Sequence, residues 1–504
     1  MNKVKSYLSP QPFKLWQVLT VSCIIVYVTV SIIYIFYGEL NADEGWYLYA
    51  GKLVYAGNTP YIDFAFTQTP LLPYVYGFFQ NFGSSPLFMG RIISVLFSSV
   101  ALIFSIQTAN KINGPVAGAL TASLWATFTY GIYYQSITKT YALLLFCMSV
   151  AIYLLVTNKD NNKSFIFISA LVLLASLTRL SALFFAIPIL TFVFIEGTKT
   201  TKLAITILCV VSIVLFGALT LPNWPSAYWN IILHHTNQWG DISNAEKAIS
   251  ILFRRVPLLF LAFPTYAALL IVILGFNFKT FLTFLQKNRI TQLILLSLIM
   301  FAVPNLASGG FHSEYFVPLL FLLSPILSCV IIAIWPTQSK ASRIALQVIL
   351  LSTFILGFLR GGQSYIDISG GKLPIREVQE LANLVQTQSD SNDLIFAFEG
   401  LWVAVEADRF TLPNMAMAQF SYFDGVSSEA VKYHLINDEM ILEALQNQEP
   451  SVLILTKTDW DLLASSEVFE ELQKTILANY VLVISQDNFG QTQDNVKLYF
   501  RVQP

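Results

Sequence analysis

The chain has 504 residues, of which 55% are hydrophobic and only 12% are charged, and its formal net charge is −1. Soluble domains carry about 25% charged residues, so the composition indicates an integral membrane protein and excludes an ordinary soluble enzyme. Nothing in this composition is typical of a nucleic-acid-binding protein, and no nucleic-acid partner is expected.

The acidic residues divide the chain into two parts. Of the 30 acidic residues, nine precede Arg360 and 21 follow it. We therefore predict an apolar membrane domain over residues 1–359 and a soluble C-terminal domain over 360–504, which is long enough to bury a core of its own. The four cysteines all lie in apolar runs and are expected to be small buried side chains: Cys23, Cys147, Cys209 and Cys329.

The first part reads as a polytopic α-helical membrane domain with about eleven transmembrane helices, because a span needs about 20 apolar residues. The first run is longer than the core of a signal peptide and is interpreted as an uncleaved anchor. The predicted spans are Leu15–Tyr37, Leu87–Ala109, Gly114–Tyr134, Thr138–Val156, Ser164–Leu177, Leu180–Ile195, Leu203–Leu221, Ile251–Gly275, Ile290–Ala307, Tyr315–Trp335 and Ile344–Leu359.

A first external loop is expected over residues 38–86. Within it, the apolar segment Thr69–Phe82 is short and carries Pro70 and Pro73. We predict an interfacial helix there rather than a further span.

The positions of the basic residues predict the orientation. With a cytoplasmic N-terminus, 13 Lys and Arg residues of the body fall inside and seven fall at outer loops or helix mouths, which is the bias that the positive-inside rule describes. An odd number of spans then places the C-terminal domain outside, in the same compartment as the first loop. We expect a multi-pass protein of the plasma (inner) membrane.

The C-terminal part alternates helix and strand patterns and is predicted to be a small α/β layer domain. Its expected helices are Arg376–Gln388, Ser428–Gln446 and Glu467–Ala478, and its expected strands are Leu394–Phe398, Val452–Thr456, Tyr480–Ser485 and Val496–Val502. It contains no glycine-rich phosphate loop, nucleophile elbow or H-E-x-x-H motif. A scaffold or a cap that docks the acceptor is the expected role.

The most informative residues are the adjacent acids Asp43 and Glu44, which follow the first span directly. A carboxylate at the edge of the bilayer is a candidate general base. The alternative is that the two acids only cap a helix that begins at Ala42.

The loop after this pair is rich in aromatic residues. Trp46, Tyr47 and Tyr61 are candidates for contacts with a sugar or an acceptor, and Asp63 is a further acid in the same loop. Asp63 lies close to Pro60, so a plain turn residue is the competing interpretation.

Several cations are expected at the outer ends of helices, where Arg and Lys suit a lipid phosphate. Snorkelling or pairing with loop acids is the alternative for each of them. The candidates are Arg91, Lys139, Arg179, Arg254 and Arg255, with His312 nearby. His234 and His235 are adjacent, do not face one site on a regular element, and are expected at the surface; no metal-ligand set is visible.

The layout of these motifs resembles the GT-C superfamily of membrane glycosyltransferases, in the branch of the protein O-mannosyltransferases and the lipid A aminoarabinose transferases. Asp43-Glu44 is similar to the acidic motif of that family's first loop. The segment from Pro60 to Leu71 resembles its P-Y-x-D-F-x-x-x-x-P-L loop, and His312 to Pro318 resembles a late H-Y-x-x-x-x-P segment. Gln68-Thr69 before Pro70, and Ser313-Glu314 inserted between His312 and Tyr315, depart from the family pattern.

The resemblance implies an inverting glycosyltransferase that moves a sugar from a polyprenyl-phosphate donor to an acceptor hydroxyl on the extracytoplasmic face. Asp43 would deprotonate or orient the acceptor hydroxyl, and Glu44 would support that group or bind the acceptor. The resemblance also implies that Arg91, Lys139, Arg179 and His312 contact the donor phosphate. No cofactor is expected, although a divalent cation is compatible with the superfamily. The acceptor is a protein, a lipid or a glycan.

Two other functions compete with this reading. A transporter or flippase of lipid-linked sugars would line a path with acids and cations, but transporters often show internal repeats, and no clear two-half repeat is visible. A membrane-anchored binding protein would carry its function in the C-terminal part, where no recognisable site is found.

Overall fold

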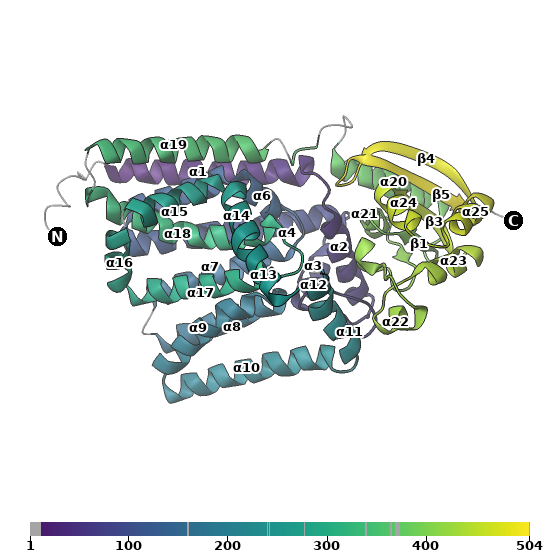
Figure 1. Ribbon diagram of the computed structural model, residues 1–504, viewed down its shortest axis with the longest axis horizontal. Helices are drawn as coiled ribbons and strands as arrows, with labels where there is room; N and C mark the ends of the chain where they lie inside the picture. Colours follow the sequence, from purple (N-terminus) through teal and green to yellow (C-terminus); the bar gives the residue numbers. More distant parts are fainter. Residues whose placement is uncertain are drawn as a thin grey trace.

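A computed structural model describes residues 12–158, 161–238, 240, 242–276, 278–337, 340–362, 365–367 and 373–502. A body of long helices is followed by a β-sheet covered by short helices, and the sheet lies at one end of the helical body (Figure 1). The helices of the body are α1 (Pro12–Tyr37), α2 (Ala42–Tyr55), α3 (Leu71–Gln80), α4 (Pro86–Asn113), α5 (Pro115–Thr127), α6 (Thr129–Ser136), α7 (Thr140–Thr157), α8 (Asn162–Thr178), α9 (Ala182–Glu196), α10 (Lys199–Thr220), α11 (Trp224–Tyr228), α12 (His234–Asn237), α13 (Asn244–Ser250), α14 (Val256–Ala262), α15 (Pro264–Phe276), α16 (Phe278–Gln286), α17 (Arg289–Ala307), α18 (Val317–Ile334) and α19 (Lys340–Gly362).

All eleven apolar runs contain helices, but they differ in length. Among the described residues, six helices are long and apolar enough to cross a membrane, and the number is seven if one strongly bent pair forms a single span. That pair is Asn244–Ala262 with Pro264–Gly275, bent by 108°. The predicted run Gly114–Tyr134 is interrupted at Phe128 between α5 and α6. The count of eleven spans therefore stays a prediction.

The segment predicted to be the first external loop contains two helices. The expected helix over 69–82 is present as α3. The chain also forms α2 immediately after the first span, and the side chain of Asn41 caps it by accepting a hydrogen bond from the Asp43 N–H. Because most of α2 is buried, the residues after Asp43 are part of the core rather than of a solvated loop.

The C-terminal part contains a five-stranded sheet in the order β2-β1-β3-β5-β4. Strands β1, β2 and β3 are parallel, whereas β5 runs antiparallel to both β3 and β4. Its elements are α20 (Pro374–Gln388), β1 (Leu394–Ala397), α21 (Leu401–Glu406), β2 (Phe410–Thr411), α22 (Ser427–Lys432), α23 (Asp438–Gln446), β3 (Pro450–Thr456), α24 (Lys457–Ala464), α25 (Phe469–Asn479), β4 (Tyr480–Phe489) and β5 (Asp494–Arg501).

One predicted helix of this part is wrong. The segment Ser428–Gln446 is not continuous, because it divides into α22 and α23. His434 between them has φ 58°, a left-handed backbone conformation that ends a helix. Because both helices have an apolar periodicity, the sequence pattern predicts one continuous helix and does not indicate this break. The domain boundary near residue 360 stays a prediction.

The sheet and its helices hold the start of α2. The indole N–H of Trp402 in α21 donates to the Asn41 carbonyl at 3.1 Å, and the Ala42 N–H donates to the Gln491 side chain at 2.9 Å. Further along α2, the Tyr49 hydroxyl accepts a hydrogen bond from the Thr411 N–H at 2.8 Å. The C-terminal part is therefore packed against the helix that carries the acid pair.

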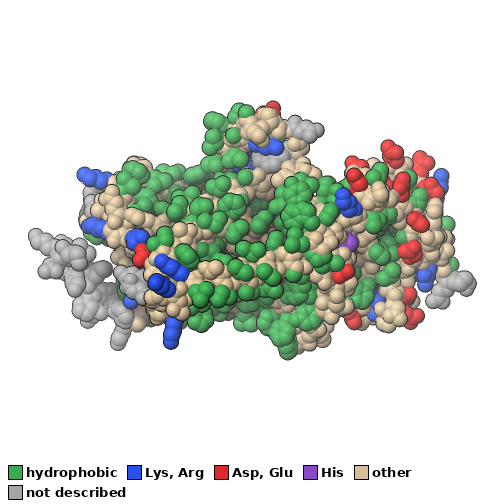
Figure 2. Space-filling view, turned by 90° about the horizontal axis from the view of Figure 1, so that it is seen from below, with side chains coloured by type: hydrophobic (Ala, Val, Ile, Leu, Met, Phe, Trp, Pro, Cys, Tyr) green, Lys and Arg blue, Asp and Glu red, His purple; other side chains and the backbone are tan. Residues whose placement is uncertain are grey.

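Charges are segregated along the long axis of the molecule. Figure 2 shows Asp and Glu gathered over the sheet and several Lys and Arg at the opposite end of the helical body, with apolar side chains between them. This distribution is what the predicted orientation requires. The inner side chains Lys3, Lys5, Lys159 and Asp160 lie outside the described residues, and the orientation stays a prediction.

Candidate functional site

The two adjacent acids at the start of α2 have different surroundings. Glu44 is completely buried, whereas the Asp43 side chain keeps 26% of its surface exposed. Successive side chains of a helix point in directions about 100° apart. The sequence pattern predicts one shared role for Asp43 and Glu44, but on the helix their side chains point to different surroundings.

Glu44 pairs with Arg91 of α4 in the interior. The two carboxylate oxygens accept from Nε and Nη2 of Arg91 at 3.0 and 2.6 Å, and neither side chain is exposed. The guanidinium also donates to the backbone carbonyls of Tyr34, Ile35, Gly38 and Glu39. Since all its donors are engaged, Arg91 has none left for a donor phosphate, and this geometry favours a structural role for the pair.

Asp43 belongs to a more open cluster. Its Oδ2 lies 2.7 Å from the ammonium of Lys139, and the same ammonium lies 2.6 Å from Oε1 of Glu314. The other oxygen, Oδ1, accepts from the indole N–H of Trp46 at 3.1 Å. Asp43, Lys139 and Glu314, called the triad below, come from three separate regions of the chain.

The triad keeps Asp43 ionised. Burial acts to raise the pKa of Asp43, but the charge and the hydrogen bond of Lys139 outweigh it and hold that pKa below the ordinary value. A hydrogen bond from Trp46 and the charge of His312 act in the same direction. The carboxylate is thus available as a hydrogen-bond acceptor at neutral pH.

A cavity of about 240 Å³ lies near the triad, because its lining includes Tyr315, which follows Glu314 directly in the chain. Arg179 lines it and donates to the Thr140 hydroxyl at 3.3 Å, next to Lys139 in the chain. The guanidinium carbon lies 4.6 Å from the Tyr315 ring centre and 5.3 Å from that of Tyr141. Within the part of the chain that the structure describes, no carboxylate pairs with Arg179. Its charge therefore remains available for an anion.

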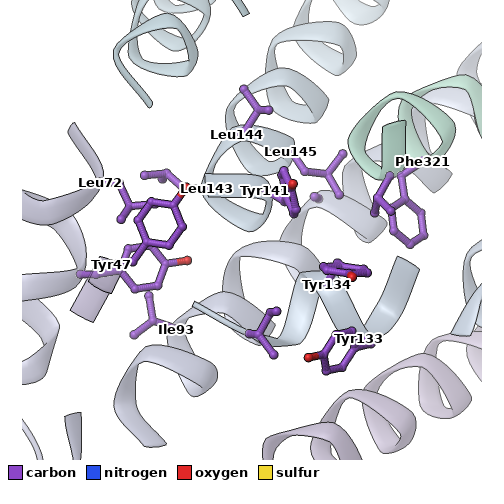
Figure 3. Close-up of a cluster of buried hydrophobic side chains, with 14 of the residues drawn as sticks. Tyr47, Leu72, Ile93, Tyr133, Tyr134, Tyr141, Leu143, Leu144, Leu145 and Phe321 are labelled. Atoms are coloured by element: carbon purple, nitrogen blue, oxygen red, sulfur yellow. The ribbon is translucent and has the colours of Figure 1, made fainter. Parts of the chain in front are cut away.

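Aromatic side chains surround the triad. Trp46 and Tyr47 are stacked with ring centres 3.7 Å apart, and both are almost fully buried. Figure 3 shows Tyr47 from α2 in one buried cluster with Tyr134 from α6 and Tyr141 from α7. Trp46 reaches the triad through its hydrogen bond to Asp43, so it positions the carboxylate rather than presenting an open face to a sugar.

The other two loop candidates lie apart from the triad. Tyr61 is completely buried and its hydroxyl donates to the Gln68 carbonyl. Asp63 is exposed and accepts from the Thr59 N–H at 2.7 Å. Asp63 therefore has the role of a turn residue, the competing interpretation from the sequence. The hydrogen bond of Tyr61 orders the same loop.

The remaining cations and histidines have several roles. His312 packs edge-on against Tyr315, and Tyr315 lines the cavity. Arg255 donates to the carbonyls of Leu306, Ser308 and Gly309 at the end of α17. His234 and His235 are half-buried rather than at the surface, and His235 lines the cavity with its Nε2 3.1 Å from the Thr67 carbonyl oxygen.

Glu314 and Tyr141 are site residues that sequence reasoning left out of the candidate set. The Tyr141 hydroxyl donates to the same Glu314 oxygen that Lys139 contacts, at 3.3 Å. Glu314 stands in the two-residue insertion between His312 and Tyr315, where the sequence departs from the family pattern. A charged residue inserted into a motif is the signal that could have found it. Within the described residues, no group of three or more His, Cys, Asp or Glu side chains could hold a metal ion.

Comparisons with known proteins agree with this architecture. Residues 67–225 match the model of the family described as dolichyl-phosphate-mannose-protein mannosyltransferase. Among curated proteins, none matches the sequence significantly.

Solved structures of similar architecture cover nearly the whole chain. ArnT from Cupriavidus metallidurans in the apo state has a TM-score of 0.64 at 13% identity, covering 96% of this chain and 98% of ArnT. The same protein bound to undecaprenyl phosphate has a TM-score of 0.61 at 12% identity, with coverages of 97% and 98%. The apo oligosaccharyltransferase of Archaeoglobus fulgidus has a TM-score of 0.52 at 10% identity and covers 98% of this chain and 75% of its own.

Proposed function

We propose that this chain is a membrane glycosyltransferase that moves a sugar from a polyprenyl-phosphate donor to an acceptor hydroxyl. Its fold is that of the GT-C superfamily, which its sequence resembles. Three findings support this proposal: the family match over residues 67–225, the undecaprenyl phosphate in a structure of similar fold, and the triad beside the cavity. The reaction face is the side on which the first loop and the C-terminal sheet lie.

The proposed reaction is a single displacement at the anomeric carbon. The Asp43 carboxylate accepts the proton of the acceptor hydroxyl while the acceptor oxygen bonds to the anomeric carbon. The bond from that carbon to the phosphate oxygen breaks, and the lipid phosphate leaves with the electron pair. Attack opposite the leaving group inverts the configuration of the sugar.

Arg179 is the best-placed group for the departing phosphate. It lines the cavity, keeps its charge unpaired among the described carboxylates, and lies over the rings of Tyr141 and Tyr315, of which Tyr141 is hydrogen-bonded to Glu314 of the triad. A fixed cation directed at developing negative charge lowers the barrier. His312, which packs against the cavity-lining Tyr315, is a second candidate, whereas Lys139 is engaged by Asp43 and Glu314, and Arg91 by Glu44.

The observation that carries the proposal is the partly exposed, ionised Asp43 in a triad whose Glu314 is hydrogen-bonded to Tyr141, the ring over which the cavity-lining Arg179 lies. The test is transfer of labelled sugar from a panel of polyprenyl-phosphate sugars by detergent-purified protein, with analysis of the anomeric configuration. Asp43→Asn keeps the shape of the side chain and removes its basicity. Asp63→Asn is the matched control, because Asp63 lies in the same loop and away from the triad.

We expect inverted product from the wild type and from Asp63→Asn, and a loss of at least about 100-fold for Asp43→Asn, the size of a general-base contribution. Retained configuration would contradict the single displacement. Undiminished transfer by Asp43→Asn would remove Asp43 from the role of base.

A further inference from the structure

Lys139 lies between two carboxylates in an unusual arrangement. Its ammonium nitrogen is 2.7 Å from Asp43 Oδ2 and 2.6 Å from Glu314 Oε1, and its side chain is 3% exposed. The carboxylates themselves keep 26% and 16% of their surface exposed. The cation is thus the buried centre of the triad, and the two acids form its open face.

The charge of Lys139 is fixed by its surroundings. Burial acts to lower the pKa of Lys139, but Asp43 and Glu314 outweigh burial and raise that pKa above its ordinary value. The ammonium also lies 5.2 and 5.5 Å from the ring centres of Tyr134 and Tyr141, within the range of cation–π attraction. Lys139 is therefore a cation at neutral pH.

This geometry leaves no room for a divalent cation between the two acids. A divalent metal binds carboxylate oxygens at about 2.0–2.6 Å and takes six or more oxygen ligands. A metal that bridged Asp43 Oδ2 and Glu314 Oε1 would occupy nearly the same point as the ammonium, and the two positive charges would repel each other strongly in this partly buried place. The triad as it stands does not fit a metal ion.

We propose that Lys139 is a built-in cation that takes the place of a divalent metal ion between Asp43 and Glu314. Lys139 acts as a positioning residue: it neutralises the two acids, holds Asp43 by Oδ2, and leaves Oδ1, which Trp46 orients, turned toward the acceptor. That Oδ1 faces an acceptor rests on the proposed function, but the test of the inference does not depend on transfer activity.

The triad makes two specific predictions about metals. While Lys139 is present, Mn²⁺ should find no site at the triad and chelation should change nothing. Without the ammonium, the two carboxylates that now contact one nitrogen lose their neutralising charge, and two neighbouring negative charges attract a cation. Removal of Lys139 should therefore create a metal site from residues that are already in place.

The experiment is titration of Mn²⁺ into the full-length, detergent-purified protein, followed by electron paramagnetic resonance of the free ion. We expect no stoichiometric binding to the wild type, one Mn²⁺ per molecule bound by Lys139→Ala, and loss of that binding in Lys139→Ala with Asp43→Asn. Lys52→Ala is the matched control, because Lys52 also forms an ion pair, but with the single acid Asp408, at 2.6 Å and outside the triad; this variant should bind no Mn²⁺.

Two results would overturn the proposal. The first is stoichiometric Mn²⁺ binding by the wild type that Asp43→Asn removes, and this arm needs no Lys139 variant to fold. The second is a folded Lys139→Ala protein that binds no Mn²⁺. If no donor supports transfer, the proposed function fails while these binding results still decide the role of Lys139.

Discussion

The Glu44–Arg91 pair and the triad contain neighbouring acids of one helix, yet they differ in every property that matters for chemistry. Glu44 is fully buried and every donor of Arg91 is engaged. The triad is partly exposed, and the cavity nearby is lined by an arginine whose charge no described carboxylate neutralises. A buried charge pair whose partners are all satisfied stabilises a structure, whereas function requires a charged group with access to a ligand.

The comparison also explains why an acidic dipeptide occurs at this point. Glu44 anchors the start of α2 to α4 through Arg91, and that anchor fixes the direction in which Asp43 points. The C-terminal part adds a second support through Trp402 and Gln491. The structural pair and the sheet together position a functional carboxylate.

The largest effect is expected from breaking the buried pair. Arg91→Met leaves Glu44 as an unpaired charge in the interior, which costs about 3–5 kcal/mol of folding free energy. Thermal unfolding in detergent should show a large fall in Tm for this variant. Lys52→Met is the control, since it removes a pair whose acid is 84% exposed; an equal loss in both variants would contradict the structural role of Arg91.

The second-largest effect is expected at Arg179, the arginine that lines the cavity. Arg179→Gln removes the charge proposed to contact the departing phosphate, and a charged hydrogen bond contributes about 1.5–3 kcal/mol, or about 10- to 150-fold in rate. Kinetic constants for the donor should show this loss with Tm nearly unchanged. A variant with wild-type kinetics would place the phosphate elsewhere.

A smaller effect is expected at the contact between the C-terminal part and α2. Trp402→Phe keeps the ring packing and removes the N–H that donates to the Asn41 carbonyl, which costs about 1 kcal/mol. We expect a modest loss of kcat with an unchanged KM, because only the position of Asp43 is disturbed. If KM changes and kcat does not, the contact serves substrate binding instead.

The smallest effect concerns pH: titration of Asp43 should not change the transfer rate near neutral pH. The pKa of Asp43 is held below its ordinary value of 3.8, so Asp43 is ionised in the folded protein above that value and is protonated only as the pH falls through its lowered pKa. Transfer rates between pH 5 and 7 should therefore show no loss from this group. A wild-type transfer rate that decreases as the pH is lowered from 7 to 5, with no such decrease in Lys139→Met, would contradict the lowered pKa assigned to Asp43.

Much of the architecture was predictable from the sequence. Each apolar run contains a helix, the interfacial segment forms α3, and the resemblance to GT-C enzymes is confirmed by the matched family model and the shared fold. Periodicity and composition carry these features because burial in a membrane acts on every residue of a long segment.

The division of roles within the site was not predictable in the same way. The sequence places Asp43 beside Glu44 and groups Arg91 with Lys139 and Arg179, but these positions differ in burial. Which acid meets which cation depends on contacts between α2, α4 and α7 that are far apart in the chain. Glu314, 175 positions from Lys139, becomes recognisable only through such a contact.

The most direct test of the central claim is specific transfer activity per folded molecule for Asp43→Asn and Glu44→Gln, measured side by side in detergent with the folded fraction determined in the same samples. The account predicts that Asp43→Asn is stable and nearly inactive, whereas Glu44→Gln is destabilised but retains near wild-type activity in its folded fraction. The opposite pattern, with activity lost from folded Glu44→Gln and kept by Asp43→Asn, would contradict it.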